Sequence, residues 1–430
     1  MVQVSQIQKR SPLTNLVQRA VLDNGITLLV IENPTADIVA SRIFIKAGTR
    51  WESKHQAGLS HLVSAVITKG TDTLSSLEIA EQVESVGASL SADTATDYLQ
   101  MSLKTIGSDF AEIFNLTAKL LRSPAFPAAE VELERQITLQ DIRSQQEHPS
   151  AIAFEQLRRA MYGRHPYGLS SLGTIESVSG LTREDLQNYH QSYFRPDNLV
   201  ISIAGNLTFE TARYLVEKAL GDWEIPTNSI LPINLSPIVC KPYQVVTPQE
   251  TQQSMVMLGY LASSVKDKEY GALKVLNTYL GNGLSSRLFV ELREKRGLAY
   301  EVSAFYPTRL DLSQFVVYLG TAPENTAIAL EGLHHEIERL RTHQLTDSEL
   351  QTCKNKLLGQ YALGKQTNAQ LAQVYGWYET LGLGIEFDTV FQELVNNVTV
   401  ETAWETACQY FVEPYISLVG PAKFVENCQI

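Results

Sequence analysis

The chain of 430 residues has few cysteines, no surplus of basic residues and no long apolar run. Its four cysteines, Cys240, Cys353, Cys408 and Cys428, are widely scattered. This spacing gives neither a disulfide framework nor a cysteine-rich zinc site, and it is typical of a reducing compartment. The net charge of −12 argues against a nucleic-acid partner, because phosphate binding needs a basic face. No run of about 18 apolar residues is present, so no membrane span is expected.

The first 25 residues have no apolar stretch of the kind that a secretory signal needs. They also lack the strongly Arg- and Ser-rich amphipathic character of an organelle transit peptide. We therefore expect a cytoplasmic protein. A hydrophobic content of 44% with 19% charged residues is ordinary for a globular protein, and the length favours two domains.

The first half alternates strand and helix signals. Asn24-Gly25, between two β-rich runs, predicts a hairpin, and residues 38–47 continue as a third strand. A second hairpin is expected over 89–95 and 98–105. Helices are expected over 57–68, 75–86, 110–122, 127–147, 151–162, 182–193 and 209–220, with a buried strand over 198–204. This is an α+β pattern, with antiparallel strands and the helices grouped on one side.

The second half repeats the first. A proline-rich segment over 226–248 predicts an interdomain linker, between domains over 1–225 and 249–430. Beyond it, strand and helix signals recur in the order of the first half, with a capping box at Thr346 before a long helix. A repeat of this size indicates two similar domains related by a pseudo-two-fold axis. Such half-shells can face each other across a cavity, a common place for ligands.

The helix expected at Gly58–Thr71 is similar to a zinc-protease helix that has lost most of its metal site. An inverted zinc motif, H-x-x-E-H, needs two histidines one helical turn apart and a glutamate between them. The histidines bind the metal, and the glutamate deprotonates the metal-bound water. Here His61 occupies the first position, whereas Ser64 replaces the glutamate and Ala65 replaces the second histidine.

These residues and several others resemble one family of enzymes along nearly the whole chain. The motifs that carry the resemblance are Asn24-Gly25, Ala47–Arg50, Gly58–His61, Lys69–Thr71, Glu84–Ala88, His165–Gly168, Tyr193–Leu199, Gly283–Leu288 and Leu292–Tyr300. The chain resembles the pitrilysin/insulinase-type metallopeptidases, in particular the short two-domain class that includes mitochondrial processing peptidase. The resemblance implies two tandem domains, each an antiparallel sheet packed with helices in a metallohydrolase-like α/β roll, which form half of a clamshell.

The resemblance also locates the remaining positions of the metal site. The family's third ligand is a glutamate on a later long helix, and it falls near Gln140-Asp141, so that at best Asp141 replaces it. A catalytic zinc takes three protein ligands, and one histidine with one aspartate is too few. We therefore expect that this chain binds no metal or other cofactor and does not hydrolyse peptides alone. We interpret His61 as an ordinary helix histidine near an interface.

A second functional element of the family lies in the C-terminal domain, where an arginine and a tyrosine reach the substrate. They match Arg293 and Tyr300, with Gly297 expected to end the helix before Tyr300 begins a strand. A tyrosine hydroxyl can donate a hydrogen bond to an oxyanion, and an arginine can hold a carbonyl or a developing charge. In the heterodimers of this class, one subunit brings the zinc motif and the other brings this pair. This chain has the profile of the second kind.

Two functional hypotheses remain open from the sequence. In the first, the chain is the non-catalytic, peptide-binding subunit of a heteromeric zinc peptidase, and a homologous H-x-x-E-H subunit is its partner. In the second, it is a non-enzymatic, homo-oligomeric scaffold or peptide-binding protein of the same fold. A homodimer is plausible in isolation under either hypothesis. Residual metal binding through His61 and Asp141 is a third, weaker hypothesis.

Overall fold

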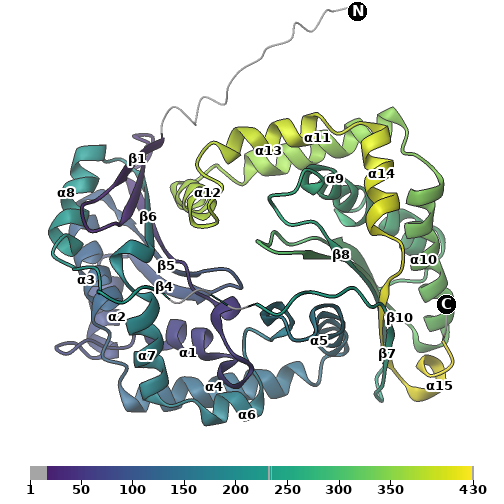
Figure 1. Ribbon diagram of the computed structural model, residues 1–430, viewed down its shortest axis with the longest axis horizontal. Helices are drawn as coiled ribbons and strands as arrows, with labels where there is room; N and C mark the ends of the chain where they lie inside the picture. Colours follow the sequence, from purple (N-terminus) through teal and green to yellow (C-terminus); the bar gives the residue numbers. More distant parts are fainter. Residues whose placement is uncertain (1–16, 231–232, 234, 429–430) are drawn as a thin grey trace, which may run out of the picture.

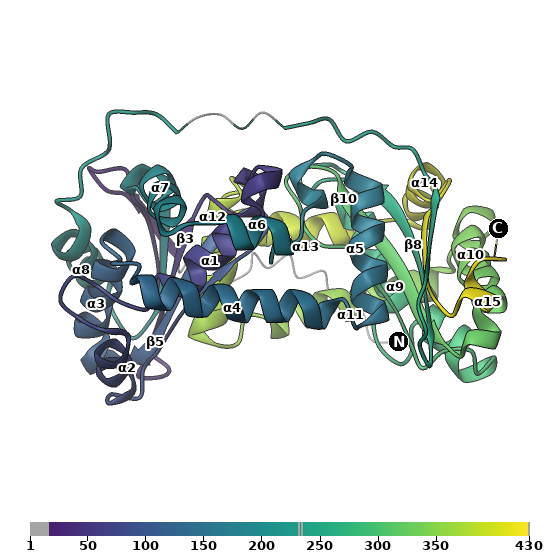
Figure 2. The ribbon, with the colours of Figure 1, turned by 90° about the horizontal axis from the view of Figure 1, so that it is seen from below.

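Two β-sheets with surrounding helices form the two ends of an elongated molecule (Figure 1). The computed structural model describes residues 17–230, 233 and 235–428. We call the part of the chain before residue 226 the N half and the part after residue 243 the C half. The described residues of the segment between them lie along one side of the molecule (Figure 2).

The N-half sheet has the strand order β1-β2-β6-β3-β5-β4. Its strands are β1 (Val17–Val21), β2 (Thr27–Glu32), β3 (Ile38–Ile45), β4 (Ser89–Thr94), β5 (Leu99–Ile106) and β6 (Leu199–Gly205). The hairpin predicted at Asn24-Gly25 joins β1 to β2, and β4 pairs with β5 as the second predicted hairpin. One pair, β2 with β6, is parallel.

The C-half sheet has the order β7-β11-β8-β10-β9. Its strands are β7 (Gln244–Pro248), β8 (Ser254–Ala262), β9 (Glu301–Phe305), β10 (Ser313–Thr321) and β11 (Tyr415–Gly420). Here β11 pairs with β7 in parallel. The last five residues of the predicted linker therefore belong to a sheet.

Fifteen α-helices surround the sheets within the described residues. Those of the N half are α1 (Leu59–Val66), α2 (Ser76–Glu84), α3 (Phe110–Arg122), α4 (Ala128–Gln145), α5 (Pro149–Tyr162), α6 (Ile175–Gly180), α7 (Arg183–Tyr193) and α8 (Phe209–Leu220). Those of the C half are α9 (Tyr270–Gly281), α10 (Thr326–Thr342), α11 (Asp347–Leu363), α12 (Asn368–Thr380), α13 (Phe387–Asn396), α14 (Val400–Tyr410) and α15 (Ala422–Val425). In this part of the chain, no helix combines the length and apolar character that crossing a membrane requires.

Each half covers one sheet face of the other half with a helix. Helix α12 packs on β3 and β6 of the N-half sheet, and α5 packs on β8 and β11 of the C-half sheet. The α+β class with two similar halves is confirmed, but helices cover both faces of each sheet. The prediction of helices on one side was wrong because an apolar helix face does not specify which sheet it will cover.

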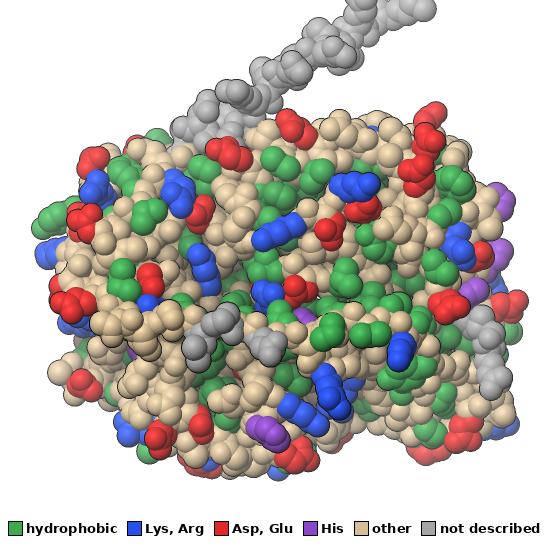
Figure 3. All heavy atoms as spheres, in the orientation of Figure 1, with side chains coloured by type: hydrophobic (Ala, Val, Ile, Leu, Met, Phe, Trp, Pro, Cys, Tyr) green, Lys and Arg blue, Asp and Glu red, His purple; other side chains and the backbone are tan. Residues whose placement is uncertain are grey.

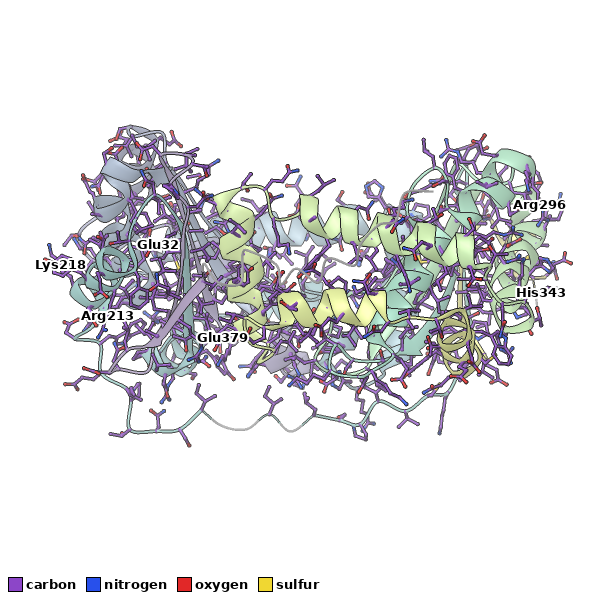
Figure 4. All side chains as sticks on the ribbon, turned by 90° about the horizontal axis from the view of Figure 1, so that it is seen from above. Glu32, Arg213, Lys218, Arg296, His343 and Glu379 are labelled. Atoms are coloured by element: carbon purple, nitrogen blue, oxygen red, sulfur yellow. The ribbon has the colours of Figure 1, made fainter. Side chains whose placement is uncertain are left out.

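Contacts at both ends fix α12 on the N half. At its start, the Asn368 amide donates to the carbonyl oxygen of Ile38 at 2.6 Å. At its end, Glu379 forms a 2.8 Å ion pair with Arg19 of β1 (Figure 4). Between them, Gly376 lies so close to Phe44 of β3 that a Cβ atom would be 2.4 Å from the phenyl ring. The glycine therefore allows α12 to approach the sheet.

Replacing Gly376 with alanine is expected to lower the free energy of unfolding by about 1–3 kcal/mol, because the methyl group overpacks this contact. Gly359 of α11 is a matched control, since a Cβ atom there meets no neighbour within 4 Å. Gly359→Ala should raise the free energy by about 0.5–1 kcal/mol through helix propensity. Urea unfolding measures both changes, and equal stabilisation by the two substitutions would contradict the packing of α12 on Phe44.

Candidate functional site

Helix α1 begins at a position where only glycine fits without strain. Gly58, its N-cap, has a φ of 92°, and a Cβ atom there would lie 2.6 Å from the carbonyl oxygen of Leu172. The buried carboxylate of Glu52 accepts hydrogen bonds from the backbone N–H of Gly58 at 3.0 Å and of Ser60 at 2.6 Å. A carboxylate at this end of the helix satisfies free N–H groups and complements the helix dipole. Glu52 thus fixes the start of the helix that carries His61.

His61 is half-buried on α1, where this helix packs against α4. Burial lowers the pKa of its imidazole, while the carboxylates of Asp141, Glu134 and Asp93 act in the opposite direction, with Asp141 the strongest of the three. The structure therefore places Asp141 where its charge acts on His61. Asp141 itself is exposed.

The other two positions of the zinc motif offer no ligand. The Ser64 side chain is buried, and its hydroxyl donates to the carbonyl oxygen of His61 at 2.8 Å. Ala65 has no polar side-chain atom. Nearby, Glu134 is paired with Lys69 at 3.1 Å. Among the described residues, no group of three or more His, Cys, Asp or Glu side chains is placed to hold a metal ion. The residues of this helix pair do not fit a catalytic zinc, which needs three ligands.

Arg293 lies in the C half, on a π-helical segment over Phe289–Lys295. Its side chain is exposed, and the guanidinium carbon lies 5.0 Å from the centre of the Phe289 ring. An aromatic ring at this distance attracts a guanidinium group and restricts its orientation. No ion pair of the described residues includes Arg293, so its hydrogen-bond donors are free for a ligand.

Tyr300 directly precedes β9 and exposes 63% of its surface. The segment between the two residues is held by backbone hydrogen bonds, from Gly297 N–H to the Arg293 oxygen at 3.1 Å and from Tyr300 N–H to the Gly320 oxygen at 2.9 Å. Leu298, in the middle of the segment, is buried. Two exposed polar side chains therefore project from a backbone that is fixed at both ends.

The predicted residues form two separate groups. His61, Ser64, Ala65 and Asp141 belong to α1 and α4 of the N half, and Arg293 and Tyr300 belong to the C half. No hydrogen bond or ion pair of the described residues joins the groups. Arg296, which follows the π-helical segment, lies at the end of the C half remote from the N half (Figure 4). This chain does not assemble one site from the two groups.

Two residues near these groups were missed from the sequence. Glu134 acts on His61 from the helix that carries Asp141, and Phe289 lies under Arg293. Helical spacing could have identified both of them. Glu134 precedes Asp141 by two helical turns, and Phe289 precedes Arg293 by about one, so that each pair shares a helix face.

The molecule also has a cavity of about 1020 Å³ that belongs to neither group. Its walls include Lys54, His55, Arg159, Arg164 and Glu176 of the N half. None of the predicted site residues lines it. On the face that Figure 3 shows, acidic and basic side chains are interspersed.

Comparisons with known proteins cover both halves. The family model described as insulinase (peptidase family M16) matches residues 27–175, and the model described as peptidase M16 inactive domain matches residues 180–357. A Bacillus subtilis protein named uncharacterized zinc protease YmxG is 28% identical over 95% of this chain and 99% of its own length. A Streptomyces coelicolor protein, also named an uncharacterized zinc protease, is 27% identical over 95% of this chain and 90% of its own length.

Two solved structures share the fold over nearly the whole chain. The crystal structure of a protease from Helicobacter pylori has a TM-score of 0.88 at 22% identity, covering 94% of this chain and 98% of that one. The structure titled peptidase M16 inactive domain from Pseudomonas fluorescens has a TM-score of 0.87 at 23% identity, with the same coverage. The family matches, the full-length relatives and this shared fold agree with the resemblance in the sequence. The chain belongs to the insulinase family of peptidases, peptidase family M16.

Proposed function

We propose that this chain is the non-catalytic, substrate-binding subunit of a heteromeric zinc peptidase. Its partner is a homologous chain with an intact H-x-x-E-H helix, which binds the zinc. The substrate is a peptide enclosed between the two subunits, in the cytoplasm. The chain supplies Arg293 and Tyr300 to the partner's site.

One observation carries this proposal. Arg293 and Tyr300 are exposed and make no side-chain hydrogen bond or ion pair within the described residues, yet their backbone is held by the bonds to Gly297 and Gly320. Donors that are preorganised and unpaired in the free protein suit the stabilisation of a charge that develops in a transition state.

The chemistry of the two side chains sets their roles. The Tyr300 hydroxyl would donate a hydrogen bond to the oxyanion of the tetrahedral intermediate. The Arg293 guanidinium, with several N–H donors in a fixed plane, would hold the substrate carbonyl next to it. Since Ser64 and Ala65 replace the glutamate and the second histidine of the motif, the water-activating group must come from the other chain.

Mixing this chain with a zinc-motif homologue from the same genome tests the proposal. We expect that the purified chain contains no stoichiometric zinc and cleaves no peptide, because Ala65 removes one ligand, Asp141 at best replaces another, and the catalytic glutamate is absent. The mixture should cleave unfolded peptides at a rate that neither chain reaches alone. Metal analysis and a fluorogenic peptide assay measure these properties.

The control is the same mixture with the glutamate of the partner's motif replaced by glutamine, which should be inactive. Stoichiometric zinc in this chain alone would contradict the proposal and favour a site at His61 and Asp141. A stable homodimer that neither binds nor activates such a homologue would favour the scaffold hypothesis instead.

A further inference from the structure

A cluster of charged and aromatic side chains joins the two halves at the loop between β9 and β10. This loop, residues 306–312, belongs to the C half and carries Asp311. Arg50 of the N half lies 2.7 Å from Asp311 and 3.9 Å from Asp97, the residue in the turn between β4 and β5. One guanidinium group therefore bridges a carboxylate of each half.

Arg50 is itself fixed on the N half. Its backbone N–H donates to the carbonyl oxygen of Thr96 at 3.0 Å, and that of Thr49 donates to Ala95 at 3.3 Å. Gly48, directly before them, allows this approach, since a Cβ atom there would lie 2.5 Å from the Ala95 oxygen. The arginine and the turn that holds Asp97 thus form one rigid unit next to the edge strand β4.

Two aromatic residues after α5 complete the cluster. The Tyr167 hydroxyl donates to Asp97 at 2.6 Å and accepts from the backbone N–H of Asp311 at 3.3 Å. His165, which exposes only 2% of its side chain, has Nε2 3.5 Å from Asp311. Its Nδ1 accepts from the Tyr167 N–H at 3.2 Å, so a neutral ring carries its proton on Nε2, toward Asp311. Every member except Asp311 is buried or nearly so.

The cluster is connected to the proposed site by a single strand. Strand β9 begins at Glu301, directly after Tyr300, and ends at Phe305, directly before the loop of Asp311. It pairs with β10 along its whole length, so its two ends cannot move independently. Five residues of strand span about 17 Å. A shift of Asp311 relative to Arg50 would therefore carry Tyr300 with it.

We propose that Arg50 is a positioning residue for the site of Arg293 and Tyr300. Its ion pair with Asp311 locks the β9–β10 hairpin onto the N half, and its ion pair with Asp97 holds the guanidinium group in place. The angle between the halves, and with it the place of Tyr300, is fixed before the partner binds. The effect of Arg50 on the rate at this site, the kinetic part of the inference, rests on the proposed function. The fixed angle between the halves, its structural part, concerns this chain alone.

The structural part is tested by the distance between the halves in the purified chain. Cysteines for spin labels replace Lys218 and His343, which lie at opposite ends of the molecule (Figure 4), in a chain without Cys240 and Cys408. Double electron–electron resonance should give one narrow distance distribution. Arg50→Met should broaden it, and Arg50→Lys, which keeps the charge, should restore most of the narrow component. An unchanged width for Arg50→Met would overturn the proposal.

Arg122→Met is the matched control, because Arg122 forms a 2.6 Å ion pair with Asp222 within the N half. It should leave the distribution unchanged. Far-ultraviolet circular dichroism and the thermal midpoint of each variant show whether it remains folded. If Arg50→Met does not fold, Asp311→Asn, which removes the charge from the exposed side of the cluster, takes its place in the same measurement.

The kinetic part uses the mixture with the zinc-motif homologue. Arg50→Met should lower kcat by about 10-fold to 100-fold with little change in KM, because a misplacement of about 1 Å at a reacting centre has effects of this size. A broadened distribution with an unchanged kcat would show that Arg50 is not a positioning residue. If the wild-type mixture is inactive, the proposed function fails, and the distance measurement still decides whether the lock exists.

Discussion

Tyr300→Phe should lower the kcat of the reconstituted peptidase by about 10²–10³-fold, the usual effect of removing one hydrogen-bond donor to an oxyanion. The substitution removes only the hydroxyl oxygen of a side chain that is 63% exposed, so the fold should not change. KM should change little, because the hydrogen bond forms with the transition state rather than with the bound peptide. Steady-state kinetics of the mixture at saturating partner measure both constants.

Arg293→Ala should behave differently, since an arginine that holds the substrate carbonyl also acts in the ground state. We expect that KM rises and kcat falls, with a loss in kcat/KM of about 10²-fold or more. The controls are Tyr214→Phe, at a tyrosine of α8 that is 60% exposed, and Arg296→Ala, close to the site but outside it. Unchanged kinetics for both Tyr300→Phe and Arg293→Ala would remove the assigned roles.

Much of the local structure could be predicted from the sequence because local signals determine it. The Asn24-Gly25 hairpin, the capping box at Thr346 and the helices expected over 75–86 and 182–193 are all present in the structure. The degenerate zinc helix was also found from the sequence, because its ligands are defined by spacing along one helix. Turns, helix starts and residue spacing along one helix could be predicted because a short segment determines each of them.

What joins distant parts of the chain could not be predicted in this way. The exchange of α5 and α12 between the sheets depends on contacts such as that of Gly376 with Phe44, and no periodicity identifies them. The parallel strand pairs in both sheets and the cluster around Arg50 also depend on contacts between residues far apart in the sequence. The predicted strands and helices end with α11, so that α12, α13, α14, β11 and α15 were missed altogether. Whether Arg293 and Tyr300 complete a partner's site stays a prediction.

A buried charge network at the base of α12 predicts the largest effect on stability. Asp388 of α13 is completely buried, and one of its oxygens accepts from Lys365 at 2.6 Å and from the hydroxyl of Tyr361 at 2.6 Å. Tyr361 of α11 is also hydrogen-bonded to Tyr378 of α12. The network therefore joins α12 to its neighbours in the chain, α11 and α13.

Asp388→Ala should lower the free energy of unfolding by about 3–5 kcal/mol, because the Lys365 ammonium, whose side chain is only 6% exposed, would remain buried without a counter-charge. Urea unfolding at neutral pH measures this change. Removing both charges with Asp388→Leu and Lys365→Met should recover most of the loss, since a buried pair and an apolar pair of similar volume are often equally stable. Recovery in the double variant would assign the effect of Asp388→Ala to the unpaired charge rather than to lost packing.

The matched control is Arg213→Ala, which breaks the exposed Arg213–Glu217 pair of α8 at the surface of the N half (Figure 4). Its free energy of unfolding should change little, because water and salt screen exposed pairs. If Asp388→Ala were as mild as this control, water would have to reach Lys365 in the native state, and the last turn of α12, which carries Tyr378, would not be rigid. Because α12 covers the N-half sheet, the angle between the halves would then depend on the packing of α5 on β8 and β11 and on the cluster around Arg50. Asp388→Ala should therefore also broaden the distance distribution between labels at positions 218 and 343, even where the chain remains folded.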